Sequence, residues 1–258
     1  MSSVAEFAYA QARLQARHAA RPDAATWRRL AGIGDRMNFL QHARTTRLRP
    51  WVLHFSSRTD VHELELSIRS QFRGSISEVA SWQPRPWRKA VLWTHQLFDL
   101  PALQHLLLGN PPPVWITNDP VLKPFALANM QQRLQALEDS EYAVFLRAWR
   151  TGTTLLDGWL TRWHGLWPKT PSKFVRPLDQ LADQLQRHVT ILETEDGTDP
   201  RTQDSDLLAD KLTYAFRRCS HQPAAAFLHL AMVALDLRQL RAALLRRTLF
   251  PEFKGADK

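Results

Sequence analysis

Histidine residues offer this chain its most versatile chemistry, because an imidazole can bind zinc or transfer a proton near neutral pH. The chain contains ten histidines. No two of them stand at helical spacing with a glutamate between them, which is the arrangement that helical zinc sites use. His62 and His188 fall in predicted helices that also carry carboxylates. We interpret both as core or solvated residues and predict no histidine metal site.

Carboxylates could bind Mg²⁺ if two acidic clusters of the sequence met in space. The clusters are Asp204, Asp206 and Asp210, and Glu138, Asp139 and Glu141. Such a site would indicate a helical metal-dependent lyase or hydrolase. The aspartate-rich helix motif that is usual in such enzymes is missing from the sequence. We therefore favour a solvated loop and helix caps, and predict no metal site.

A nucleophilic active site is not indicated either. Ser81, Ser172 and Ser220 lie in no glycine-flanked turn of the kind that presents a catalytic serine. Cys219 is the only cysteine, which excludes an intramolecular disulfide and a zinc site built from cysteines. We expect Cys219 to be a buried thiol in a reducing compartment. The sequence therefore predicts a protein that is not an enzyme and that needs no cofactor.

Arginine and tryptophan are the residues best suited to bind a partner, because both are favoured anchors at protein interfaces. Residues 1–58 contain ten arginines and only three acids, whereas residues 193–210 contain seven acids and one arginine. The chain is therefore electrically polarised. The candidate partner-binding residues are Arg13, Arg17, Arg28, Arg29, Arg44, Arg47, Trp51, Trp87 and Trp115.

Nucleic acid is the alternative partner for these arginines, since the net charge of +9 suits a polyanion. No recognised nucleic-acid-binding motif accompanies them. Arginine also outnumbers lysine by 27 to 7, and a GC-rich genome can produce that ratio on any solvated helix face. We therefore rank nucleic-acid binding below protein binding and keep both.

The composition, 44% hydrophobic and 23% charged, is typical of a globular protein. The first twenty residues contain no apolar run of signal-peptide length. The longest apolar stretch, residues 224–235, is much shorter than the roughly twenty residues that a membrane span needs. We predict a cytoplasmic protein that does not cross a membrane.

Apolar residues recur at intervals of three and four, which predicts an all-α fold with almost no β-sheet. Near the N-terminus we expect a helix from a Ser2 or Ser3 cap to Ala20, and helices capped by Asp23 and Asp35. The strongest prediction is a long helix capped by Thr59, with Glu63 near its start. Its apolar stripe is Val61, Leu64, Ile68, Phe72, Ile76 and Val79.

Further helices are expected over 87–98, over 100–108 with Asp99 as its cap, and around Leu127–Leu137. Residues 142–167 predict one long helix or two. The C-terminal part predicts helices over 178–192, 206–219 and 223–249, with an exposed acidic loop at 193–205. The last helix is apolar on more than one side, which indicates a central position.

Three consecutive prolines, Pro111, Pro112 and Pro113, mark residues 110–120 as a connector between helices. We expect this connector to divide the chain into an N-terminal helical subdomain, 1–110, and a C-terminal helical subdomain, 121–258.

The N-terminal segment Phe7–Arg17 resembles the opening of the C/d-type rotor-stalk subunit of V-type ATPases. That family begins with a similar Tyr-Ala-x-Ala-Arg helix. A short helix like 27–30, a segment ending in Arg44-Thr45-Thr46 and a long helix like 60–72 follow in the family's order. Near the C-terminus, Leu235–Arg241 looks like the family's Glu-x-x-Asn-Leu-Arg helix, with Gln239 in place of the asparagine.

The resemblance covers the N-terminal third and the last helix, and the chain is shorter than typical members of the family. It implies an all-helical funnel, or an array of helical units, without chemistry of its own. Such a protein seats a rotor shaft on a ring of membrane subunits. It would be peripheral at the inner face of the membrane and would touch that membrane only through its protein partners.

Overall fold

The computed structural model describes the backbone of residues 4–194 and 201–250 and the side chains of residues 5–187 and 207–250. These residues form helices and connecting turns and contain no strand, which confirms the predicted all-α class. None of the described helices combines the length and the apolar character that crossing a bilayer requires.

Five helices are longer than the others: α1 (Ala8–Ala19), α5 (Val61–Trp82), α12 (Ser172–Thr194), α13 (Arg201–Arg218) and α14 (Ala224–Leu249). The shorter helices are α2 (Ala24–Ala31), α3 (Arg36–Ala43), α4 (Arg49–Val52), α6 (Arg85–Leu92), α7 (Leu100–Leu107), α8 (Val114–Asn118), α9 (Met130–Glu138), α10 (Ala143–Arg150) and α11 (Leu155–Gly165). Three 3₁₀ helices complete the set: η1 (Val4–Phe7), η2 (Trp93–Phe98) and η3 (Lys123–Phe125).

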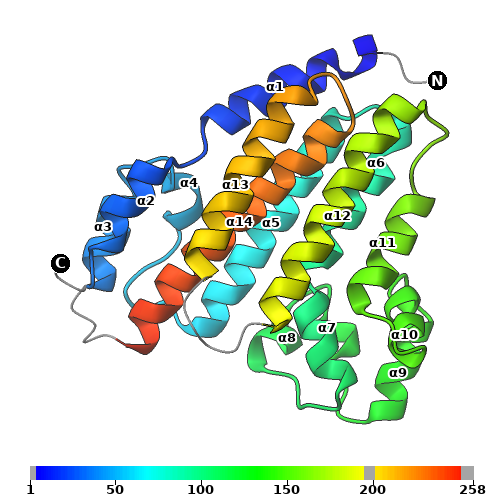
Figure 1. Cartoon of the computed structure of the whole chain (residues 1–258). Helices are drawn as coiled ribbons and strands as arrows, with labels where there is room; N and C mark the ends of the chain where they lie inside the picture. Colours follow the sequence, from blue (N-terminus) through cyan, green and yellow to red (C-terminus); the bar gives the residue numbers. More distant parts are fainter. Residues whose placement is uncertain (1–3, 195–200, 251–258) are drawn as a thin grey trace.

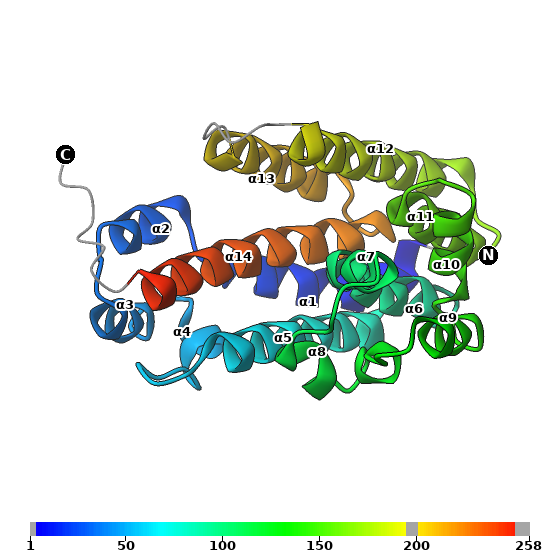
Figure 2. The ribbon, with the colours of Figure 1, turned by 90° about the horizontal axis from the view of Figure 1, so that it is seen from below.

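Helix α14 is the central element, as its sequence predicts. It packs against α13 and α12 on one side and against α5 and α1 on the other. In Figure 1 it runs diagonally through the molecule, and Figure 2 shows it between the α12–α13 layer and α5. Most of its residues from Ala224 to Leu240 are buried. Helix α14 is apolar on more than one side because other helices pack against more than one of its sides.

The short helices α2, α3 and α4 lie at one end of the molecule, next to the last turns of α14, and α9–α11 lie at the opposite end (Figure 1). Arg247 of α14 fixes the end of α2 to α14. Its guanidinium donates hydrogen bonds to the carbonyls of Leu30 and Ile33, where α2 ends. The last carbonyls of a helix lack partners within the helix, so this arginine caps α2.

Helix α5 begins one residue later than predicted. Its N-cap is Asp60 rather than Thr59: the Asp60 carboxylate accepts a hydrogen bond of 2.8 Å from the Glu63 amide, and the Glu63 side chain accepts one from the Asp60 amide. Thr59 instead accepts a hydrogen bond from the amide of Ser56 in the preceding turn. Both residues are good caps, and the turn decides between them.

Replacing this cap by Asp60→Ala is expected to lower the free energy of unfolding by about 1 kcal/mol, because it removes one partner of the reciprocal capping box. Urea unfolding followed by circular dichroism measures the change. Ser57→Ala, at an exposed position in the same turn, is the matched control. Equal stability of the two variants would contradict the role of Asp60.

The helices capped by Asp23 and Asp35 are confirmed, and each carboxylate accepts a bond from the amide three residues later. The predicted Ser2 or Ser3 cap lies outside the described residues. Residues 142–167 form two helices, because Gly152 takes a left-handed φ of 73° and Thr154 starts α11 with its own capping box. The predicted loop at 193–205 is wrong at both ends, where α12 and α13 extend into it; residues 195–200 lie outside the described part.

The proline-rich connector contains one short helix, α8, which begins directly after Pro113. Helix α5 precedes the connector and α14 follows it, yet the two pack closely against each other. Buried apolar side chains from both parts belong to one hydrophobic cluster. The two subdomains predicted on either side of residues 110–120 therefore share a single core.

Candidate functional site: an arginine-rich end and a buried ion-pair network

The structure places the predicted arginines on the outside of α1–α3 and of the turns that follow. Arg28 and Arg29 are exposed in the last turn of α2. Arg13 is exposed on α1, where its guanidinium lies near the rings of Tyr9 and Trp82. Arg17 forms an exposed ion pair with Glu78 of α5. Arg13 and Arg17 therefore already have intramolecular contacts, whereas Arg28 and Arg29 are exposed on α2, at one end of the molecule.

Arg44 and Arg47 are exposed near the same end. Arg44 donates a hydrogen bond to the carbonyl of Phe55, and Arg47 donates one of 3.2 Å to the carbonyl of Arg21. Neither of these bonds neutralises the charge. Asp23 and Asp35 lie nearby as helix caps, but the four exposed arginines outnumber these two acids, so an excess of positive charge faces solvent there.

The three predicted tryptophan anchors have different environments. Trp87 is 0% exposed in α6, so its assignment as a surface anchor is wrong; the sequence places it beside prolines, but α6 turns it into the core. Trp51 is partly buried at the edge of the core. Trp115 of α8 is also partly buried, and its ring centroid lies 4.1 Å from the guanidinium carbon of Arg69. None of the three is a fully exposed side chain.

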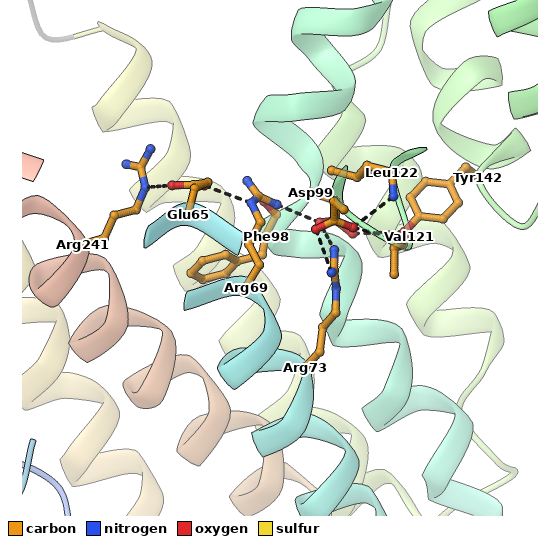
Figure 3. Close-up of polar contacts among 10 residues, drawn as sticks. Glu65, Arg69, Arg73, Phe98, Asp99, Val121, Leu122, Tyr142 and Arg241 are labelled. Atoms are coloured by element: carbon orange, nitrogen blue, oxygen red, sulfur yellow. Dashed lines mark hydrogen bonds and ion pairs between the residues drawn. The ribbon is translucent and has the colours of Figure 1, made fainter. Parts of the chain in front are cut away.

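A buried ion-pair network that is centred on Asp99 includes Asp119 of the connector (Figure 3). One carboxylate oxygen of Asp99 accepts hydrogen bonds from Arg69, at 2.9 Å, and from Arg73, at 3.1 Å. The other oxygen accepts a bond of 3.0 Å from the hydroxyl of Tyr142. Asp99 was predicted to cap α7, but its side chain makes no capping bond. The two arginines and the tyrosine bind its oxygens instead.

The network extends in two directions from Asp99. Toward α14, Arg69 pairs with Glu65 at 2.9 Å, and Glu65 also pairs with Arg241. Toward the connector, Arg73 pairs with Asp119 at 2.8 Å. The second oxygen of Asp119 accepts bonds from two backbone amides, those of Val121 and Leu122. Three arginines thus meet three carboxylates and join α5, α14, the start of α7 and the end of the connector.

Burial raises the pKa of Asp99, while Arg73 and Arg69 act in the opposite direction. Burial, together with the adjacent Asp99 charge, also raises the pKa of the Tyr142 hydroxyl, which therefore remains a hydrogen-bond donor at neutral pH. Both oxygens of Asp99 and both oxygens of Asp119 have donors within the protein. Asp99 and Asp119 are both 0% exposed, and their hydrogen bonds hold α5, the start of α7 and the end of the connector together.

The sequence analysis did not predict the buried arginines. Arg69, Arg133 and Arg247 are each at most 5% exposed, although the sequence indicated solvated arginines. Arg133 donates hydrogen bonds to the carbonyls of Leu127, Leu106 and Asn110, and so fastens α9 to the end of α7. One signal was available: Glu65 and Arg69 stand four residues apart beside the apolar stripe of α5, which is the spacing of a helical ion pair.

Of the acids considered as metal ligands, Asp204 and Asp206 have side chains outside the described residues, whereas Glu138 and Asp139 have other partners. Glu138 forms an ion pair with Arg150, and Asp139 accepts hydrogen bonds from Gln135. Asp210 is exposed on α13. Among the side chains that the structure describes, no three histidine, cysteine or acidic residues come together as potential metal ligands. Cys219 is a buried thiol, as predicted.

The segments that resemble the V-type ATPase stalk protein also meet in space. The first resembling segment lies on η1 and α1 and the last lies on α14, and both helices contact each other and α5. Ion pairs link the last segment to its neighbours: Arg21, just after α1, pairs with Asp236 of α14 at 2.6 Å, and Arg241 of α14 pairs with Glu65 of α5. Asp236 and Arg241 both belong to the resembling segment Leu235–Arg241.

Comparison of the sequence with protein-family models gives no match, and comparisons with curated proteins and with solved structures give none either.

Proposed function

We propose that the chain is a non-catalytic coupling protein that resembles the C/d-type rotor-stalk subunit of V-type ATPases and links a rotor shaft to a membrane ring through protein contacts. One observation supports this proposal above the others. The resembling segments come from opposite ends of the chain, yet they pack against one another around α5, and the acid and an arginine of the last segment form ion pairs there. The protein would act in the cytoplasm, at the inner face of the membrane, through its partners.

The binding surface in this proposal is the arginine-rich end, which we define as Arg28, Arg29, Arg44 and Arg47. Its four arginines are exposed and outnumber the two nearby acids, Asp23 and Asp35, which cap helices. Complementary charge steers association and fixes the orientation of partners. An acidic face of a partner protein is therefore the expected counterpart of this end.

Purification of the tagged protein from its native cells in mild detergent tests the proposal. We expect stalk or ring proteins of a rotary ATPase to co-purify in a fixed ratio. Recovery of the protein without any of them would overturn the assignment to an ATPase.

Charge reversal tests the surface itself. The double variant Arg28→Glu/Arg29→Glu is expected to weaken binding to the co-purified partner by at least about tenfold, because two attractive contacts become repulsive. Arg147→Glu/Arg162→Glu is the matched control: both residues are exposed in the last turns of helices, α10 and α11, at the opposite end of the molecule. Equal binding by the two double variants would contradict the assignment of the arginine-rich end as the binding surface.

Nucleic acid remains the second candidate partner, since the same exposed arginines would suit phosphate groups. In that case the purified protein would carry nucleic acid that high salt removes, because phosphate contacts depend strongly on salt. Arg28→Glu/Arg29→Glu would then weaken binding to DNA or RNA of any sequence.

A further inference from the structure

A cluster of aromatic and basic side chains, separate from the ion-pair network, joins α13 to the rest of the molecule. Phe216 of α13 contacts both His18 of α1 and His229 of α14. The ring centroid of Phe216 is 4.7 Å from that of His18 and 6.3 Å from that of His229. Phe216 and His229 are both about 3% exposed. The contact between α13 and its two neighbours therefore includes two imidazoles.

Both imidazoles are placed where a positive charge is unfavourable. The Nδ1 atoms of His18 and His229 are buried and have no hydrogen-bond partner among the described residues. Burial, together with the nearby Arg21, His18 and Arg17, lowers the pKa of His229 to about 3. Burial, together with Arg21 and Arg217, also lowers the pKa of His18. In the closed structure both rings are therefore neutral near pH 7.

The charged groups around the cluster do not offset a new positive charge. Arg17 and Arg21 approach from the α1 side and Arg217 from α13. Two of these arginines have carboxylate partners of their own: Asp236 of α14 pairs with Arg21, and Glu78 of α5 pairs with Arg17. A protonated imidazole would thus face guanidinium groups from two sides.

We propose that this cluster is an acid-sensitive joint, at which protonation of His18 and His229 releases α13 from α1 and α14. Once α13 moves away, both rings reach water and can bind protons. Protons therefore stabilise the open form and not the closed one. Other contacts oppose the opening: Thr213 of α13 donates to the sulfur of Met232, and the amide of His221, just after α13, donates a 3.1 Å bond to Gln11. The joint is closed near neutral pH and opens more often as the pH falls.

The size of the effect follows from linkage. Between the ordinary histidine pKa of 6.5 and the value of about 3 in the closed form, the open form binds more protons, so the closed form loses stability as the pH falls through this window. From about pH 7.5 to about pH 5, the opening constant is expected to rise roughly 30-fold from His229 alone. His18 adds to this rise.

Hydrogen exchange of the α13 residues 207–218, corrected for the intrinsic pH dependence of exchange, measures the opening. The rise should be confined to α13 and the residues that face it, and should be absent from α10 and α11. The double variant His18→Gln/His229→Met should remove most of the rise. His54→Gln, an exposed histidine between α4 and α5, should leave it unchanged.

Two results would overturn the joint. One is an equal rise in α10 and α11, which would indicate global acid unfolding. The other is an unchanged rise in the double variant. If the double variant does not fold, His18→Gln alone must still reduce the rise, because His18 is only partly buried and lies at the edge of the cluster; an unchanged rise in that variant would also overturn the joint.

Discussion

Asp99→Ala is expected to lower the free energy of unfolding by about 3–5 kcal/mol, because it leaves two buried guanidinium groups without a shared counter-ion. Asp99 is 0% exposed and accepts hydrogen bonds from Arg69, Arg73 and Tyr142. Arg69 keeps Glu65 and Arg73 keeps Asp119, so the network is weakened rather than removed. A typical domain is stable by only about 5–15 kcal/mol, so the loss is severe.

The control for this variant is Glu138→Ala, which removes a carboxylate that also pairs with an arginine. The Glu138–Arg150 pair is almost half exposed on both sides, and exposed pairs contribute about 0–1 kcal/mol. Urea unfolding of both variants gives the comparison. If Asp99→Ala lost no more stability than Glu138→Ala, Asp99 would not hold the network together.

Local signals in the sequence were sufficient to predict most helices. The Asp23 and Asp35 caps are confirmed because a capping bond joins residues only three positions apart. The α5 stripe is confirmed because periodicity reports which face of one helix is buried. The same local reasoning was off by one residue at Thr59, where two adjacent residues can both cap and the preceding turn selects Asp60.

Contacts between distant segments could not be predicted in this way. Asp99 has good N-cap chemistry, but its partners come from α5 and from Tyr142, 43 positions away. No local pattern specifies such a partner. Exposed arginines near the N-terminus were expected, but the burial of Arg133 and Arg247 was not. Both side chains are buried because they donate hydrogen bonds to backbone carbonyls of other helices. Every residue has a backbone carbonyl, so the sequence does not indicate which carbonyl an arginine will bind.

Tryptophan shows the same limit for the candidate binding site. Trp51 and Trp87 each stand directly after a proline, and sequence context alone made both candidate anchors. In the structure they differ in burial: Trp87 packs in the core and Trp51 lies at the edge of the core. The difference depends on which helices pack against each segment, and these helices are far away in the sequence.

Trp87→Ala therefore tests the structural role that burial assigns to Trp87. We expect it to lower the free energy of unfolding by about 3–5 kcal/mol, because it removes a large side chain from a closely packed interior and leaves a cavity. In a chain of this size the melting temperature should fall by roughly 6–20 °C.

Trp51→Ala is the matched comparison, since Trp51 is also a tryptophan after a proline but is only partly buried. Its loss of stability should be clearly smaller, because part of its ring already contacts water. Calorimetry of the two variants measures the difference. A Trp87→Ala protein that melts like the unaltered protein but no longer binds its partner would restore Trp87 as an anchor. A large loss of stability identifies Trp87 as core and leaves the exposed arginines to make the contact.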